Sequence, residues 1–328
     1  MNTSYSGFKL LFFQVVCLIL AILALWQLPS HLNRHMVNVV CIILFSGLAA
    51  ASLNLLLGFG GLASLGQGAF AGIAAYAFAI FRVSQGWDYA FAVVFALIVV
   101  VVASGLFGFF SMRCSGITYM MMTLALANLV HMTALQWAEL TGGYNGITRV
   151  MGPTIWGVSY SGTRMTFPII AVVVPICFFL LKRITTSPFG MAIQGMRDNS
   201  IKMNSLGFDI RVIRILLTII GGLFAGIAGI LMTNFYAFIS PHNVSVHVSV
   251  MYLFMGVLGG ASSIFGGLLG AGMFLLARNY ISGLTAMYYD AILGILFILC
   301  VFIMRKGVMG LPIFSGHFWK KMLPAKKA

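Results

Sequence analysis

The feature that most constrains this chain is a succession of long apolar stretches with only short polar intervals between them. Ten stretches are candidates for membrane-spanning helices, because such a helix needs about 20 mainly apolar residues to cross a bilayer. They are 10–28, 37–57, 69–81, 89–111, 117–137, 167–181, 212–235, 248–258, 264–280 and 287–304. The stretches 69–81 and 248–258 are short, so eight or nine spans are alternatives to ten.

The composition excludes a soluble domain. Of the 328 residues, 61% are hydrophobic and only 7% are charged, whereas a soluble domain carries about 25% charged residues. We therefore expect an all-α membrane protein, a polytopic bundle of about ten transmembrane helices that forms a single domain over residues 1–328. The net charge of +14 is typical of Lys and Arg in cytoplasmic loops. Since no nucleic-acid-binding motif accompanies it, we expect the bilayer, and no nucleic acid, as the partner of this charge.

Residue patterns typical of catalytic and metal sites are missing from the sequence. It contains no HExxH, no GxSxG and no pair of carboxylates within one span, which argues against an intramembrane enzyme. The five cysteines form no CxxC pair, and His31 and His35 have no Cys or carboxylate beside them. We expect no catalytic residue, no cofactor and no metal.

The distribution of Lys and Arg predicts the orientation of the chain. If both termini and residues 187–211 are cytoplasmic, fourteen of the 19 Lys and Arg residues lie on the cytoplasmic side. They are Lys9, Arg113, Lys182, Arg183, Arg197, Lys202, Arg211, Arg214, Arg305, Lys306, Lys320, Lys321, Lys326 and Lys327. This asymmetry obeys the positive-inside rule, so we expect both termini, including the basic tail 305–328, in the cytoplasm.

The interval 187–211 is the most charged segment between two spans and has the signals of ordered structure. Ser187 followed by Pro188 is typical of a helix start. Asp198, Asn199 and Ser200 are caps for a second helix, and Gly207 is a left-handed stop. We predict two short helices, about 188–195 and 200–206, on the membrane face.

Two glycine-rich breaks of similar sequence interrupt the apolar pattern. The first break, GGLASLGQG, occupies 60–68, and the second break, GGASSIFGG, occupies 259–267. Such breaks in corresponding halves of a transporter indicate its transport pathway. Alternatively, the glycines only permit close packing and the polar residues only bond neighbouring helices. The candidate pathway residues are Asn54, Gly60, Gly61, Ser64, Gln67, Thr123, Asn128, Gly259, Gly260, Ser262 and Ser263.

Five segments together resemble the permeases of branched-chain amino-acid ABC transporters, the LivM/LivH family, and the LivM half in particular. They are LNLLLGFGGLASLGQGAFAGIAAY (53–76), TYMMMTLALANLVHMTALQW with LTGGYNGI (118–147), FGMAIQGMRDNSIKMNSLGFDI (189–210), FAGIAGILMTNFYAFISP (224–241) and VLGGASSIFGGLLGA (257–271). Asp198 stands where the family commonly has Glu, and Gly267 where it commonly has Pro. Urea and short-amide permeases share these motifs, so the motifs leave the substrate open.

The resemblance implies a permease subunit of an ATP-driven ABC importer in the bacterial inner membrane, with branched-chain (hydrophobic) amino acids as substrates. The chain has no GxxxxGK[ST] sequence, so partner subunits must bind the ATP. The implied partners are a second, LivH-like permease chain, two ABC ATPase subunits and a periplasmic or lipid-anchored substrate-binding protein. An ATP-independent channel or facilitator is the other alternative.

The resemblance also assigns a role to residues 187–211, the cytoplasmic loop that couples to the ATPase, through Gly190, Arg197, Asp198, Asn199, Lys202 and Gly207; the alternative is a plain membrane-surface loop. The outer segment 138–166 is a candidate surface for docking of the binding protein, with Thr141, Gly142, Gly143 and Asn145 as candidates. Alternatively, its glycines only shape a turn.

Overall fold

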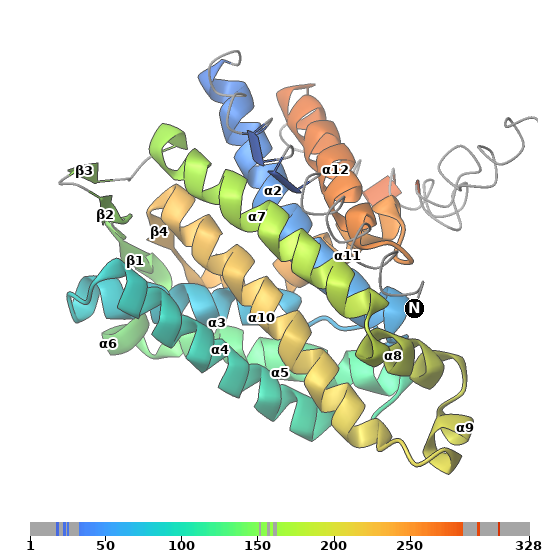
Figure 1. The fold of residues 1–328 in the computed structure, drawn as a ribbon. Coiled ribbons are helices and arrows are strands. Elements are labelled where there is room, and N and C mark those ends of the chain that lie inside the picture. Colours follow the sequence, from blue (N-terminus) through green and yellow to red (C-terminus); the bar gives the residue numbers. More distant parts are fainter. Residues whose placement is uncertain are drawn as a thin grey trace, which may run out of the picture.

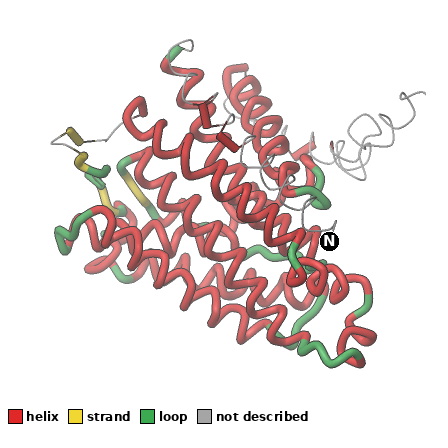
Figure 2. The backbone as a smooth tube through the Cα atoms, viewed as in Figure 1, coloured by secondary structure: helices red, strands yellow, loops and turns green. Residues whose placement is uncertain are grey.

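The computed structural model describes residues 33–150, 152–155, 158–159 and 163–284, with a few isolated positions on either side. The predicted spans 10–28 and 287–304 and the basic tail 305–328 lie outside these continuous ranges. Helices make up nearly all of the described backbone (Figure 2).

Six of the described helices are long and apolar enough to cross a membrane. They are α2 (Arg34–Asn54) with its π-helical extension η1 (Leu55–Phe59), α4 (Tyr89–Ser111), α5 (Gly116–Gln136), α7 (Thr163–Thr186), α10 (Ile210–Tyr236) and α12 (Ile264–Leu284). The prediction of an all-α membrane protein is therefore confirmed.

The predicted count of ten spans is not supported by the described residues. The stretches 69–81 and 248–258 do form helices, α3 (Gln67–Ala79), which continues as the π-helix η2 (Ile80–Ser84), and α11 (Val246–Gly259). Neither is among the six helices that are long and apolar enough to span. At 1.5 Å per residue, the 14 residues of α11 rise about 20 Å, which is too short to cross a hydrocarbon core of about 30 Å. Each short helix adjoins a glycine-rich break, where Gly61 and Gly260 have positive φ and helical hydrogen bonding stops.

Helix α3 lies in the interior of the bundle, behind α4 and α10 in Figure 1, and packs against both of them. Nearly all of its side chains are buried. Helix α10 packs closely on it through a face of small residues. A Cβ atom at Gly229 would overlap the carbonyl oxygen of Ala71, and one at Gly226 would come within 3.1 Å of the Ala74 methyl group. Small residues let helix backbones approach in this way inside a membrane protein.

Helices α2, α11 and α12 also pack closely through small residues. A Cβ atom at Gly267 would lie 2.5 Å from the backbone nitrogen of Ala51, and one at Gly270 would overlap the carbonyl oxygen of Met255. Helix α7, which contains Pro168 and Pro175, crosses α2.

Helices α4 and α5 carry the apolar outer surface of the described structure. Only a minority of their side chains are buried, and many are exposed, among them Phe91 and Val102 on α4 and Ile117 and Leu129 on α5. Water does not tolerate such a continuous apolar face, so lipid or another membrane chain must cover it.

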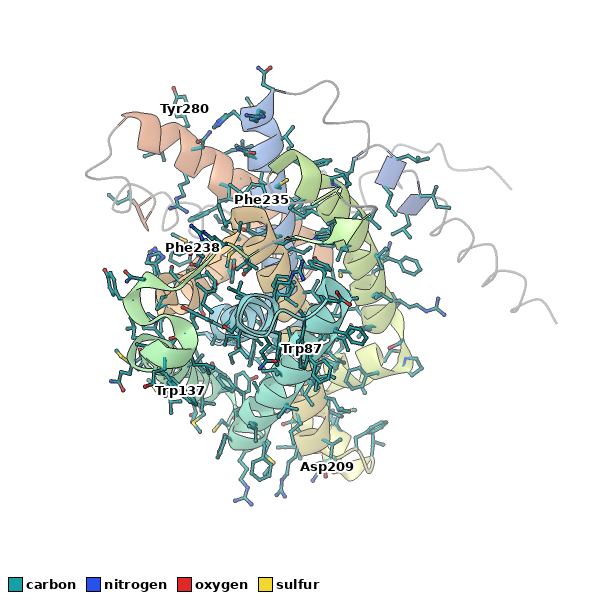
Figure 3. The ribbon with its side chains drawn as sticks, turned by 90° about the vertical axis from the view of Figure 1, so that its left-hand side faces the viewer. Trp87, Trp137, Asp209, Phe235, Phe238 and Tyr280 are labelled. Carbon is teal, nitrogen blue, oxygen red and sulfur yellow. The ribbon has the colours of Figure 1, made fainter. Side chains whose placement is uncertain are left out.

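The two ends of the bundle differ. At one end, the short helices α8 (Pro188–Asp198) and α9 (Ser200–Ser205) connect α7 to α10. At the other end lie α6 (Ala138–Thr141), η3 (Gly143–Asn145), η4 (Pro241–Val244) and the strand pairs β1 (Ile147–Thr148) with β4 (Phe238–Ile239) and β2 (Thr154–Ile155) with β3 (Val158–Ser159). Asp209 marks the first end in Figure 3, and Phe235 and Phe238 mark the second.

Candidate functional site

The segment 187–211 folds as its capping signals predict. The Ser187 hydroxyl accepts a hydrogen bond from the backbone nitrogen of Gly190 at 3.2 Å, and Asn199 accepts one from that of Lys202 at 3.0 Å. Gly207 has a φ of +88° and ends α9. The two predicted short helices are confirmed, although α8 runs three residues beyond the predicted 195 to Asp198.

Helix α8 is held firmly against the bundle. Its side chains Ile193 and Met196 are buried. A Cβ atom at Gly190 would overlap the carbonyl oxygen of Thr185, so the helix starts in direct contact with the end of α7. A displacement of α8 therefore has to move the elements beneath it.

Arg197, at the end of α8, contacts the start of the first break. Its Nη1 atom donates a 2.6 Å hydrogen bond to the carbonyl oxygen of Gly58. Its aliphatic stem lies 2.7 Å from the position of a Cβ atom on Gly61. The guanidinium also pairs with Asp198 at 2.9 Å. The predicted residues Arg197, Asp198 and Gly61 are thus brought together, whereas Gly58 was missed.

The second glycine-rich break, about 200 positions later in the sequence, contacts the helical turn that leads into the first break. A Cβ atom at Gly58 would overlap the carbonyl oxygen of Ala261. The Asn54 side-chain nitrogen donates to the carbonyl oxygens of Ser263 at 3.0 Å and Gly260 at 3.4 Å. Asn54 is fully buried, and its side-chain oxygen has no hydrogen-bond partner among the described residues.

The polar residues of the first break are buried and bonded to its own backbone or to α2. The Ser64 hydroxyl accepts from the backbone nitrogen of Gly66, and Thr123 on α5 accepts from that of Leu65. Gln67 accepts from Ser52 at 3.3 Å, while its side-chain nitrogen, like the Asn54 oxygen, lacks a partner among the described residues. A buried polar atom without a partner carries a free-energy penalty, so both amides retain an unused capacity for a hydrogen bond.

Four predicted pathway residues do not join this cluster. Asn128 is exposed on α5, and Ser262 is exposed in the turn before α12. Gly259 instead packs against the carbonyl oxygen of Gly266, within the second break itself. Gly60 packs against the side chain of Leu217 on α10.

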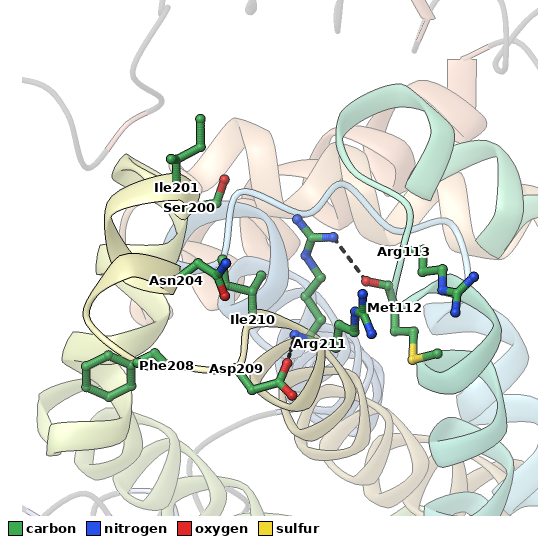
Figure 4. A pocket seen from close by; sticks show the side chains of 11 residues that line it. Met112, Arg113, Ser200, Ile201, Asn204, Phe208, Asp209, Ile210 and Arg211 are labelled. Atoms are coloured by element: carbon green, nitrogen blue, oxygen red, sulfur yellow. Dashed lines mark hydrogen bonds between the residues drawn. The ribbon is translucent and has the colours of Figure 1, made fainter.

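A groove of about 660 Å³ opens beside α9, between the start of α10 and the loop after α4 (Figure 4). Arg113, Arg211 and Arg214 contribute its positive charge, and Asp209 its negative charge. Arg214 donates to the carbonyl oxygens of Met112 and Cys114, which fixes the loop between α4 and α5. No motif singled out Arg214 or Met112; only the charge of the neighbouring interval pointed to this region.

The candidate docking loop at the opposite end is also rigid. Thr141 is buried, and its hydroxyl donates to the carbonyl oxygens of Ala134 and Trp137. Gly142 and Gly143 have positive φ, as the predicted turn requires. Strand β1 then pairs with β4, Ile147 opposite Ile239. Asn145 is exposed, and so is its neighbour Tyr144, at 88%.

Comparisons with known proteins reveal relatives of this sequence. The family model described as "Branched-chain amino acid transport system / permease component" matches residues 35–301. The chain is 27% identical over 327 residues to the high-affinity branched-chain amino acid transport system permease protein LivM of Escherichia coli, covering 93% of this chain and 76% of that protein. It is 27% identical over 314 residues to the protein of the same name from Salmonella typhimurium, covering 89% and 73%. No solved structure matches the chain significantly.

Proposed function

Because the chain belongs to the family of branched-chain amino acid transport permease components, we propose that it is the permease subunit of an ATP-driven importer of branched-chain amino acids. As a member of that family, it is a multi-pass membrane transport component and not an enzyme. Its membrane is the bacterial inner membrane. Its partners are a second, LivH-like permease chain, two ABC ATPase subunits and a periplasmic or lipid-anchored binding protein.

The hydrogen bond from Arg197 to Gly58 is the observation that carries the coupling role. An ATPase that closes on ATP and pushes on α8 moves Arg197, and Arg197 is bonded to the segment that leads into the first break. Gly58 in turn touches Ala261 in the second break. A displacement of α8 is therefore passed through Arg197 and Gly58 to both breaks, in only two contacts.

The surface around α9 suits an ATPase partner. Ile201 is 80% exposed and Leu206 is 72% exposed, and the groove of Figure 4 lies beside them. Exposed apolar side chains rimmed by charges are typical of protein interaction sites. Gly190, Asp198, Asn199, Lys202 and Gly207 serve this surface by setting the shape and charge of the two helices.

The orientation of the chain in the membrane follows from the position of the ATPase subunits, which work in the cytoplasm. The segment 187–211 faces the cytoplasm, as do both termini, and the end that carries η4 faces outward. We propose that α3 and α11 lie at membrane depth as buried short helices. With the predicted spans 10–28 and 287–304, they complete the ten-segment arrangement of the single domain. Irregular backbone such as the two breaks is tolerated at that depth only where protein or a water-filled cavity surrounds it.

At the outer end, the loop with Thr141, Gly142, Gly143 and Asn145 is proposed to dock the binding protein. Its backbone is fixed by the pairing of β1 with β4, and it presents Tyr144 and Trp137 to the outside. Tyr and Trp are enriched at protein interfaces because they offer a large contact area at a small entropic cost.

Uptake into proteoliposomes tests the proposed function. The chain is reconstituted with the permease, ATPase and binding-protein subunits encoded beside it, and labelled leucine, isoleucine, valine and urea are offered in parallel. ATP-dependent uptake of the branched-chain amino acids is the expected result. Uptake of urea alone would show that the proposed substrate is wrong and the ATP-driven mechanism is right. Uptake that persists without ATP would show that the protein is a facilitator.

A further inference from the structure

A cavity of about 310 Å³ lies between α2, α10, α11 and α12, at the end of the bundle opposite to α8 and α9. Cavities of about 300 to 1,000 Å³ are typical of small-molecule sites, and this volume is at the small end of that range. None of the proposed pathway residues lines it.

The inner wall of the cavity is apolar and buried. Phe45 on α2, Met232 on α10, Met255 on α11 and Leu275 on α12 line it and are each less than one tenth exposed. Met side chains adapt to irregular apolar shapes. A wall of this kind accepts a short branched alkyl group. It disfavours a purely polar solute, which would lose its hydrogen bonds to water there.

The mouth of the cavity is polar and positively charged. Arg278 and the exposed His242 and His247 lie on it, and none of its fourteen lining residues is Asp or Glu. Arg278 comes from α12, beside Tyr236 at the end of α10. The five N–H groups of an arginine match the geometry of a carboxylate. The hydroxyl of Tyr236 and its ring face are suitable partners for an ammonium group.

Arg278 also faces a second, outer hollow. That hollow, of about 280 Å³, lies between α2 and α12, and Ile42, Tyr236, Leu275 and Arg278 line both spaces. The two spaces therefore adjoin at these shared side chains, and Arg278 stands where they meet.

The inner end of the cavity leads to Asn54 and the second break. Met255 is followed by Gly256, and a Cβ atom at Gly256 would lie 2.5 Å from the unpartnered side-chain oxygen of Asn54. Asn54 in turn is bonded to the second break through Ser263. The cavity, Asn54 and the breaks thus follow one another along α11, from one end of the bundle toward the other.

We propose that this cavity is an entry site for a small apolar α-amino acid, in which Arg278 binds the carboxylate and the wall of Phe45, Met232 and Met255 receives the side chain. This assignment rests on the proposed function and adds to it the residues that recognise the substrate. Urea and short amides lack both a carboxylate and a branched chain, so the site separates the two substrate classes that the family motifs leave open.

Binding to the purified complex of permease and ATPase chains, without the binding protein, tests the site. The probe is labelled L-leucine, with L-leucinamide and urea as competitors. In Arg278→Gln, the affinity for leucine is expected to fall by roughly 10- to 100-fold, because a hydrogen bond to a charged group is lost. The affinity for leucinamide, which has no carboxylate, is expected to change little. Arg34→Gln removes an exposed arginine from the same end of the bundle and is expected to bind leucine as the original chain does.

A second variant tests the apolar wall independently. Ser46, on α2, is buried and lines the cavity. Ser46→Leu places a larger side chain in the cavity and so reduces its free volume. The variant is expected to weaken leucine binding more than alanine binding. This size dependence also tests the site if Arg278→Gln does not assemble.

The outcomes separate this inference from the proposed function. If ATP-dependent leucine uptake is present but Arg278→Gln binds leucine normally, the cavity is not the entry site and the importer remains. The same conclusion follows if Arg278→Gln weakens leucine and leucinamide equally, because the residue then acts on structure alone. If only urea is taken up, the substrate in the proposed function is wrong.

Discussion

The guanidinium of Arg197, at the end of α8, donates a 2.6 Å hydrogen bond to the carbonyl oxygen of Gly58, 139 positions earlier in the chain. The bond links a short helix at one end of the bundle to the helix that leads into the first glycine-rich break. Gly61, within that break, has a φ of +66° and packs on the stem of the same arginine. The residue therefore contacts the break through both its charge and its aliphatic part.

Replacing Arg197 with Gln is expected to lower ATP-dependent leucine uptake by about tenfold or more, since a charge-assisted hydrogen bond contributes about 1.5–3 kcal/mol and 1.4 kcal/mol corresponds to a factor of ten. ATP hydrolysis by the assembled complex is expected to continue. Uptake and hydrolysis are measured in the same proteoliposomes.

The matched control for this prediction is Arg183→Gln. Arg183 is an exposed arginine near the end of α7, so the variant has the same change in charge at the same end of the bundle. It is expected to transport normally. Equal uptake in the two variants would remove Arg197 from the coupling role.

The side chain of Asn54 links α2 to the second break, and Asn54→Leu tests that link. The variant leaves the buried carbonyl oxygens of Gly260 and Ser263 without their donor, which is expected to cost about 1–3 kcal/mol of stability. The measurement is thermal unfolding of the detergent-solubilised complex, together with uptake. Asn128→Leu, at an exposed position on α5, is expected to leave both unchanged. A normal melting temperature for Asn54→Leu would show that the breaks do not depend on this side chain.

The small-residue face of α10 predicts a sharp difference between two glycine variants. In Gly229→Ala the added methyl group meets the backbone oxygen of Ala71, and overpacking of this kind costs about 1–3 kcal/mol. In Gly105→Ala, on α4, the nearest atom is 3.7 Å away. That variant is expected to be neutral or stabilising, because Ala favours the helix. Unfolding temperatures in detergent measure both, and similar values would contradict the packing described here.

The outer loop makes a prediction about the binding protein. Tyr144→Ala is expected to raise the concentration of binding protein needed for half-maximal uptake by several-fold, because interface tyrosines often contribute more than 1 kcal/mol. Tyr280→Ala removes another exposed tyrosine, 73% exposed on α12, and is expected to have no such effect. If both variants need the same concentration as the original chain, docking takes place elsewhere.

Local signals in the sequence were reliable where they depend on a few neighbouring residues. Ser187 and Asn199 cap the helices that they were predicted to cap, and Gly207 takes the left-handed conformation. The likeness of the two breaks predicted a shared site; the structure brings the second break against Asn54 and Gly58, which precede the first break, and the pathway role stays a prediction. The number of spans was harder to predict. A short helix such as α11 is as apolar as a spanning one, and hydrophobicity alone does not reveal that it ends after 14 residues.

The sequence by itself determined the solvent and the class of this protein, because 61% hydrophobic and 7% charged residues leave no other way to cover the core than a bilayer. It also determined the short helices of 187–211, whose caps act within three residues. Only the tertiary structure decided that Arg197 reaches Gly58, that Asn128 faces away from the cluster, and that Arg278 stands at the mouth of an apolar cavity. These contacts join positions far apart in the chain. Their geometry depends on how closely glycine faces such as those of Gly229 and Gly267 let the helices approach, and no local pattern encodes it.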